Sequence, residues 1–322
     1  MRNISSANKN KELISTISSR FGIYIAFILL CTVLSILSPY FFRIKNISNI
    51  LNQVSIIGII ALGSTVVLIS GGLDLSPGAV VAVAGVMAAQ FGHPGQFPIY
   101  VPILVAVATG TLFGAFNGIM TALGGVPPFI VTLGTLSVGK GLAMLACGGM
   151  QVIDLSPAFV NIAGADLFGI PILIVLFAAC FIVLNFVMSK MRFGRRVYAV
   201  GGNELSAHAS GVNVKLVKIG VYALAGALSG FGGLLLASRT VVGSPISGSG
   251  YELDAIAAAV IGGTSTTGGI GRLSGTIIGA LIIQVISNGL DMLNVPSYYQ
   301  QIVKGLIIIF AVFIDMRSKR SE

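Results

Sequence analysis

The stretch KMRFGRRVYAVGGNELSAHASGVNVKLVK (190–218), called the polar island below, is the one long polar segment of this chain and has long apolar segments on both sides. It contains six of the chain's 19 Lys and Arg residues but only one acid, Glu204. Membrane proteins keep such basic loops on the cytoplasmic side. The island therefore sets the orientation of a membrane protein and marks a place where a soluble partner could dock.

The composition is that of a polytopic α-helical membrane protein. Of the 322 residues, 55% are hydrophobic and only 9% are charged, whereas a soluble domain carries about 25% charged residues. The 42 glycines, with no Trp, suit closely packed membrane helices, in which small residues let the backbones approach. The apolar runs do not alternate with polar residues, as the strands of a membrane β-barrel would. We therefore expect an all-α polytopic membrane protein.

Ten segments have the length and apolar character of transmembrane helices, several of them broken by Gly or Pro. The first is an uncleaved span and not a signal peptide, because no small-residue cleavage site follows it. An even number of spans returns the C-terminus to the side of the N-terminus. The predicted spans are 21–42, 50–70, 77–91, 98–122, 127–148, 170–189, 217–238, 251–264, 273–289 and 298–315.

The basic residues favour one orientation of these spans. Thirteen of the 19 Lys and Arg lie near the N-terminus, in the polar island or near the C-terminus, which places all three in the cytoplasm. The polar loop 149–169 has no Lys or Arg and falls outside, while Arg43 and Lys45 are interpreted as snorkelling interfacial residues. The expected organisation is a cytoplasmic N-terminal segment (1–20), a single transmembrane domain (21–316) with the cytoplasmic loop 190–218, and a cytoplasmic tail (317–322).

The motifs do not indicate an enzyme, a metal protein or a nucleic-acid-binding protein. The segment GTLSVGKG (134–141) fits the first seven places of a phosphate loop, but Gly141 stands where Ser or Thr must hold Mg²⁺. Lys140 is better interpreted as a charge at the membrane interface or the edge of a pore. The net charge of +9 has no folded polar domain to present it to a nucleic acid. Cys31, Cys147, Cys180, His93 and His208 lack the spacing of metal or redox ligands.

Two of the predicted spans are too short for about 30 Å of hydrocarbon. Each follows a polar break rich in Gly and Pro, namely GGLDLSPG (71–78) and GSPISGSGYELD (243–254). Interrupted segments in corresponding positions indicate an inverted repeat with a pathway near the membrane midplane. We predict that spans 2–5 repeat as spans 7–10, with spans 1 and 6 peripheral, although no residue-by-residue match supports the repeat.

The polar island contains a short helix with both ends marked. Asn203 is a good N-cap, Glu204 lies in the first turn, and Gly211 is a good residue to end the helix. The predicted helix, Glu204–Ser210, has about two turns and is too short to persist alone in water. It either packs on its own membrane domain or seats in a partner's cleft. In the second case Leu205 and Ala209 form one face, and Ala207 and Ser210 allow close approach.

Polar residues within the spans are candidates for the pathway, since such residues are costly in a membrane. Each also has a structural interpretation. The residues Asp74 and Ser76 can cap the helix that Pro77 begins, and Glu252 and Asp254 lie in the first turn of theirs. The amides of Asn117, Gln284 and Asn288 can bond between helices, and Asp291 is a further acid beside a span.

Four stretches closely resemble the membrane permeases of ribose-type sugar ATP-binding-cassette importers. They are GRRVYAVGGNELSAHASGVNV (194–214), GSGYELDAIAAAVIGGTSTTGGIGRLSGTIIGAL (248–281), ISGGLDLSPG (69–78) and PPFIVTLGTLSVGKG (127–141), and the similarity runs from about Gly22 to Asp315. The resemblance implies a multi-pass protein of the bacterial plasma (inner) membrane with both termini in the cytoplasm. Two such subunits, expected as a homodimer, would form a pathway for a monosaccharide such as ribose.

The resemblance also implies the partners and the site residues. A cytoplasmic ATPase would bind ATP and Mg, an extracytoplasmic binding protein would deliver the sugar, and this chain would bind no cofactor. The family usually has a small residue or Arg after GGNE, so Leu205 and His208 depart from its pattern. Coupling to the ATPase is assigned to Gly194, Arg195, Gly201, Gly202, Asn203, Glu204, Ala207 and Gly211. The candidate pathway residues are Asp74, Ser76, Asn117, Phe129, Tyr251, Glu252, Asp254, Gln284 and Asn288.

An ion-coupled secondary sugar transporter is the main alternative. It predicts a carboxylate in mid-span with a basic partner, whereas Asp74, Glu252 and Asp254 stand at expected helix starts and we expect no mid-span Lys or Arg to pair with them. A solute channel is a third class, but a basic docking helix has no purpose there.

Overall fold

The structure, a computed structural model, describes residues 22–320 and is helical apart from one pair of two-residue strands, β1 (Asp166–Leu167) and β2 (Ile170–Pro171). The predicted N-terminal segment 1–20 lies outside the described residues. A helix lies over each predicted span: Gly22–Leu37, α2 (Ile44–Ile69), α3 (Pro77–Gln90), α4 (Tyr100–Ala122), α5 (Pro128–Ala146), α7 (Ile172–Lys190), α10 (Val214–Thr240), α11 (Tyr251–Ile261), α12 (Leu273–Met292) and α13 (Ser297–Arg320). Three more helices are α6 (Pro157–Gly164), α8 (Arg192–Gly202) and α9 (Glu204–Ala209).

Six helices of the described chain are long and apolar enough to cross a membrane, namely α2, α4, α5, α7, α10 and α12. The protein is therefore a polytopic membrane protein. The helix Gly22–Leu37 and α3 are apolar but shorter, and α11 has only 11 residues. Ten crossings and the inverted repeat accordingly stay predictions. Residues 317–320, expected as part of a tail, continue α13.

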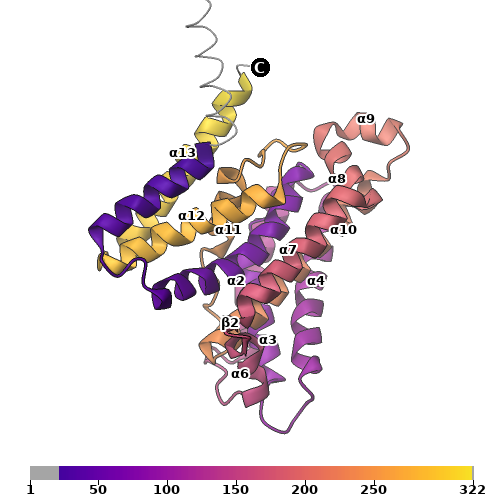
Figure 1. Cartoon of the computed structure of the whole chain (residues 1–322). Coiled ribbons are helices and arrows are strands. Elements are labelled where there is room, and N and C mark those ends of the chain that lie inside the picture. The colour runs from indigo at the N-terminus through magenta and orange to yellow at the C-terminus, as the bar shows by residue number, and fades with distance from the viewer. Residues whose placement is uncertain (1–21, 321–322) are drawn as a thin grey trace, which may run out of the picture.

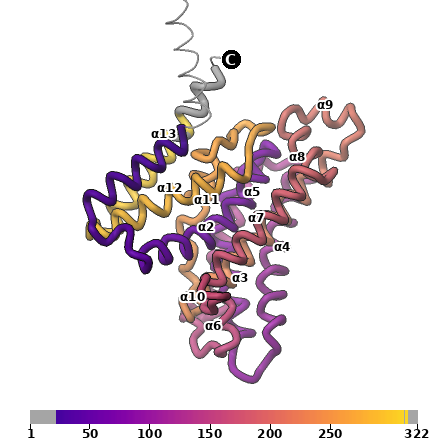
Figure 2. The backbone as a smooth tube through the Cα atoms, in the orientation of Figure 1, coloured from indigo at the N-terminus to yellow at the C-terminus, as the bar shows by residue number. Residues whose placement is uncertain are grey.

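The most buried of the six long apolar helices is α2, which packs against α7, α10, α11 and α12. Its second half is buried without interruption from Val54 to Ile69. Figure 2 shows α12 and α13 beside the helix Gly22–Leu37 on one side of α2, with α4, α7 and α10 on the other. By contrast, α7 buries only four of its residues, and the helix Gly22–Leu37 buries only Leu34. This low burial agrees with the prediction that spans 1 and 6 are peripheral, which stays a prediction together with the repeat.

Glycines allow α4 and α10 to pack closely along their lengths. A Cβ at Gly114 of α4 would overlap the carbonyl of Tyr222 on α10, and a Cβ at Gly226 would overlap the carbonyl of Gly110. The backbones therefore touch where a side chain would hold them apart, as in other membrane helices with small residues four apart. This pair forms a rigid unit that carries the polar island at one end.

The two polar breaks of the sequence meet inside the molecule. A Cβ at Gly78, in the first turn of α3, would overlap the carboxylate of Glu252 in the first turn of α11. This contact between the starts of the short helices α3 and α11 is called the half-helix junction below. From it, α3 runs towards α6, where the Ser156 amide donates to the Gly92 carbonyl (2.8 Å). The other half-helix, α11, runs in the opposite direction, to the loop 262–272 beside α8 (Figure 1). Two half-helices thus begin at one place and diverge.

The two polar loops of the chain lie at opposite ends of the molecule. Figure 1 shows α8 and α9 at one end, and α6 with β2 at the other. The loop 262–272 lies at the α8 end, because the Tyr198 hydroxyl of α8 donates to the Gly271 carbonyl (2.9 Å). This separation agrees with the prediction that the loop 149–169 and the polar island lie on opposite sides of the membrane. The cytoplasmic orientation of the α8 end stays a prediction.

Candidate functional site

The short helix predicted in the polar island is α9, and its two ends are as expected. The side chain of Asn203 accepts a hydrogen bond from the Ser206 amide (2.8 Å), and Gly211 follows the helix with φ +81°. Glu204 lies in the first turn, where the helix dipole favours an acid. Ser210 caps the helix instead of belonging to it, so α9 is one residue shorter than predicted.

α9 rests on its own membrane domain with one face and exposes the other. Ala207 is only 5% exposed and packs in the core, so it cannot approach a partner as the sequence suggested. Lys218 of α10 holds Glu204 in an ion pair (2.7 Å). In contrast, Leu205 is 83% exposed and Ala209 is also exposed. The structure therefore bears out the packing of α9 on its own membrane domain, whereas seating in a partner's cleft stays a prediction. The free face of α9 is the one that contains Leu205.

A cavity of about 1100 Å³ separates α9 from the turn between α4 and α5. Its walls include Leu205 and His208 of α9, Pro127 and Pro128 of the turn, and Lys215 of α10. Leu205 and His208 are the two residues that depart from the family's pattern, so the departures lie together on this cavity. A partner that seats here would touch both.

α8 was missed in the sequence, although its pattern is helical. Gly194, Val197 and Val200 are buried while Arg195 and Arg196 are exposed, which is the three-residue spacing of an amphipathic helix. Gly201 touches the end of α2, because a Cβ there would overlap the Ile69 carbonyl. The coupling candidates Gly194 and Gly201 thus serve close packing, Arg195 faces outward, and Gly202 ends α8 in an exposed position.

α8 also contacts the loop that follows α11. The phenol of Tyr198 donates to Gly271, and burial raises the pKa of this phenol, although Arg272 nearby lowers it. The phenol is therefore protonated at neutral pH and remains a donor. Because α9 follows α8 directly, α8 joins α9 to both the end of α2 and the loop 262–272.

The first polar break forms a buried network with α4. Asp74 accepts hydrogen bonds from the amide and the hydroxyl of Ser76 (2.8 and 2.6 Å), and the Asn117 amide donates to the same hydroxyl (2.9 Å). Asp74, Ser76 and Asn117 are each less than 5% exposed. Ser76 occupies the N-cap position of α3 without a side-chain cap bond, so the predicted capping by its hydroxyl is wrong. The hydroxyl joins two side chains instead.

The second break brings a carboxylate to the starts of both half-helices. Glu252 and Asp254 lie in the first turn of α11, as predicted. The Glu252 carboxylate also lies against Gly78, the second residue of α3. Lys140 of α5 is near enough to attract it. The positive ends of two helix dipoles and one cation therefore act on this single acid.

Asp254 has a basic partner that the sequence analysis did not assign. Its carboxylate accepts a hydrogen bond from Lys304 of α13 (2.9 Å), and their side chains are 8% and 25% exposed. The expectation that no mid-span Lys or Arg pairs with these acids is wrong, and capping alone does not describe Asp254. Lys304 lies within the predicted span 298–315, and this charge could have identified it as a functional candidate from the sequence, because intramembrane charges rarely occur without function.

Two polar cavities flank the start of α11. The first, about 340 Å³, lies between α3, α5 and the loop 245–249, and Lys140 and Ser247 line it. The second, about 530 Å³, lies between α11 and α13 and is called the α11–α13 chamber below. Its lining includes Ser249, Tyr251, Glu252, Asp254, Gln301 and Lys304. The structure therefore gathers polar groups from both breaks and from α13.

The other candidate pathway residues lie away from these cavities. Asn288 of α12 exchanges hydrogen bonds with Asn46 of α2 (2.9 and 3.1 Å), which is the bonding between helices that the sequence suggested. Gln284 is buried in α12, and Phe129 is half exposed on α5. Asp291 accepts from Gln300 (2.7 Å) at the start of α13. None of these four is among the residues that line the two polar cavities.

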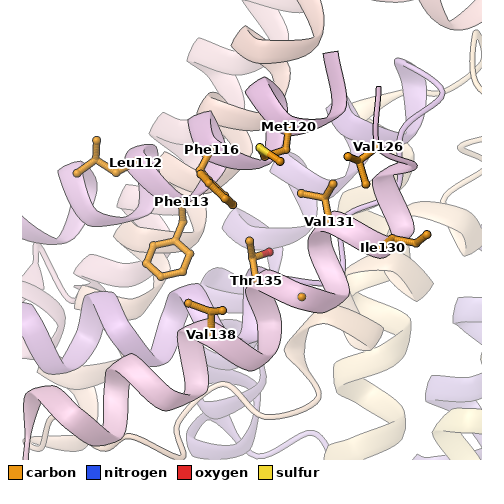
Figure 3. A pocket seen from close by; sticks show the side chains of 10 residues that line it. Leu112, Phe113, Phe116, Met120, Val126, Ile130, Val131, Thr135 and Val138 are labelled. Atoms are coloured by element: carbon orange, nitrogen blue, oxygen red, sulfur yellow. The ribbon is translucent and has the colours of Figure 1, made fainter. Parts of the chain in front are cut away.

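A separate cavity, about 540 Å³, lies between α4 and α5 and is apolar (Figure 3). Thr135 is the one polar side chain in its lining, and its hydroxyl already bonds to the Thr132 carbonyl (3.1 Å). The cavity is thus suited to hydrocarbon and not to a polar solute. The segment 134–141 on the same helix forms regular turns of α5, so its backbone amides do not cradle a phosphate.

Comparisons with known proteins give one answer about the family. The family model described as "Branched-chain amino acid transport system / permease component" matches residues 46–312. The chain is 42% identical to the ribose import permease protein RbsC of Haemophilus influenzae, over 91% of each chain, and 41% identical to that of Bacillus subtilis, over 94% of each. It is 36% identical to the D-allose transport system permease protein AlsC of Escherichia coli, over 92% of this chain and 91% of that one. No solved structure matches the chain.

Proposed function

The chain belongs to the family of transport-system permease components, and on that premise we propose that it is the membrane-spanning subunit of an ATP-driven importer for a monosaccharide. Ribose is the cargo best supported, because relatives that are 42% and 41% identical to this chain are named for ribose import. Others are named for D-allose and xylose. The protein would lie in the bacterial inner membrane with both termini in the cytoplasm, and a partner subunit would hydrolyse ATP.

The observation that carries this proposal is the α8–α9 unit in the polar island. α9 is capped at both ends, fixed to the membrane domain by Ala207 and Lys218, and exposes Leu205 beside a large cavity. A helix with a fixed inner face and a free apolar residue on the outside is suited to receive force from a soluble subunit. The free face is the docking surface for the ATPase, and α8 passes the movement to α2 and the loop 262–272.

The pathway in this proposal follows the half-helix junction. Transporters place substrate near the midplane where discontinuous helices meet, and rigid bundles rock about that place. Here α3 and α11 begin together, and the two polar cavities lie beside them. A second copy of the chain would complete the pathway, and an extracytoplasmic binding protein would deliver the sugar. A weak internal site suits such a carrier, because tight binding would hinder release.

The test is transport by defined components. The chain is reconstituted in liposomes with the ATPase and the sugar-binding protein encoded beside it, and uptake of radiolabelled D-ribose is measured with and without ATP inside. We expect uptake only when ATP, the ATPase and the binding protein are all present. Uptake without the ATPase would contradict the proposal.

The ion-coupled sugar transporter remains the second candidate because of the Asp254–Lys304 pair. This intramembrane carboxylate with a basic partner is the feature that such a transporter predicts. The permease is therefore also reconstituted alone, with a proton or sodium gradient and no ATP. Accumulation of D-ribose in these liposomes would favour the second candidate, and its absence together with ATP-dependent uptake would remove it.

A further inference from the structure

The α11–α13 chamber has the size and the lining for one small polar solute. Its volume is about 530 Å³, within the range of about 300–1,000 Å³ found for small-molecule sites. The lining joins the loop that precedes α11, the first turn of α11 and the polar first half of α13. The chamber thus lies at the half-helix junction, where the pathway of the proposed function passes.

The groups in the chamber match a solute with several hydroxyls. Each hydroxyl both donates and accepts hydrogen bonds. Asp254 offers acceptor oxygens and Lys304 offers donors, already held together at 2.9 Å. The amide of Gln301 can donate and accept, and the Ser249 hydroxyl can do the same. Adjacent donors and acceptors at fixed positions suit the neighbouring hydroxyls of a sugar.

The charge at the junction disfavours an anionic solute. In other transporters the positive ends of half-helices point at anionic groups of the substrate. In this chain Glu252 already occupies that position, because its carboxylate lies in the first turn of α11 and against Gly78 of α3. The charge of Asp254 is balanced by Lys304. A carboxylate on the solute would therefore lie near the negative charge of Glu252, and no uncompensated positive charge would attract it.

We propose that the α11–α13 chamber is the place where the permease itself contacts its cargo, and that Glu252 restricts this contact to neutral polyhydroxylated solutes. The inference rests on the proposed function and adds to it a site and a specificity residue.

Protection of a cysteine in the chamber tests the site. In the full complex, with Cys31, Cys147 and Cys180 replaced by Ser, Ile308→Cys in the lining of the chamber is labelled by a membrane-impermeant thiol reagent in the presence of D-ribose or of D-ribonate, its open-chain oxidised form, which carries a carboxylate. At about ten times its dissociation constant, D-ribose should slow labelling about tenfold, because only about one chamber in ten is then empty, and D-ribonate should not. The matched control is Tyr298→Cys on the exposed side of α13, where neither compound should protect.

A second variant tests the specificity residue. In the Ile308→Cys background, Glu252→Gln removes the carboxylate, and D-ribonate should then protect the introduced thiol as D-ribose does. Equal protection by both compounds before this substitution, or protection at position 298, would overturn the inference, as would failure of D-ribose to protect. ATP-dependent uptake is measured in the same liposomes. Uptake without protection of the thiol would refute only the assignment of the chamber as the contact site for the cargo. Protection of the thiol without ATP-dependent uptake would refute only the proposed function.

Discussion

Asp254 and Lys304 lie 50 residues apart in the chain and form one intramembrane ion pair. The sequence identified Asp254 because a carboxylate beside a span stands out, and it placed the acid correctly in a first turn. It did not identify the partner, because pairing depends on how α13 packs on α11, and nothing local encodes that packing. The sequence therefore predicts the chemistry of a single residue such as Asp254, whereas the partner of that residue depends on the tertiary fold.

The pair gives a prediction about stability. Breaking a buried ion pair leaves one charge uncompensated and costs about 3 kcal/mol or more, whereas replacing both partners by neutral groups costs much less. Because Lys304 is a quarter exposed, we expect a smaller loss, about 2 kcal/mol, for Asp254→Asn or Lys304→Gln alone. The double variant should be at least as stable as either single variant. Thermal unfolding in detergent measures all four proteins.

A first-turn acid that only caps α11 would behave differently. Asp254→Asn would then lower the melting temperature, Lys304→Gln would leave it unchanged, and the two effects would add. Additivity within about 0.5 kcal/mol would show that the two residues do not interact.

α9 was predicted and α8 was not, and the reason lies in their ends. α9 is fixed by local signals, since Asn203 and Gly211 mark its boundaries within nine residues. α8 has no side-chain cap at either end, because Met191 precedes it and Asn203 serves α9. Its only signal is the spacing of Val197 and Val200 against the exposed arginines. The polar breaks before α3 and α11 could also be predicted from local signals, because they are rich in Gly and Pro. Their contact at Gly78 could not be predicted, because it depends on tertiary packing.

The exposed face of α9 gives a prediction about docking. Leu205→Asp should weaken binding of the ATPase by about 2 kcal/mol, roughly 30-fold, if Leu205 is an anchor of the interface. Since the side chain is 83% exposed, the melting temperature of the isolated permease should not change. Co-purification of the ATPase and ATP-dependent uptake measure the loss.

The matched control lies on the same helix, two residues away. Ala207→Trp should lower the melting temperature, because Ala207 is buried in the core and a large side chain does not fit. An unchanged affinity for the ATPase in Leu205→Asp would show that this face of α9 is not the docking surface.

The molecule as a whole joins its docking loop to its pathway through few contacts. α8 touches the end of α2, which leads into the break before α3, and it touches the loop 262–272, which follows α11. One rigid segment thus reaches both half-helices from the side where the ATPase is proposed to dock. The positions of the apolar helices could be predicted from apolar runs, while the number of crossings and their orientation stay predictions. This connection could not be predicted, because it rests on backbone packing at Gly201 and on one phenol.

Tyr198 is where this connection can be weakened without disturbing either end. Tyr198→Phe keeps the ring and removes the hydrogen bond to Gly271, which is worth about 1 kcal/mol. If that bond transmits the movement of α9, ATP hydrolysis should continue while the D-ribose transported per ATP falls about fivefold. Tyr100→Phe, a tyrosine exposed at the start of α4, is the control and should keep the ratio of the wild type. Equal losses of hydrolysis and transport in Tyr198→Phe would place the residue in docking or folding. Hydrolysis and transport both at the level of the wild type would mean that the movement travels through the contact of Gly201 with α2.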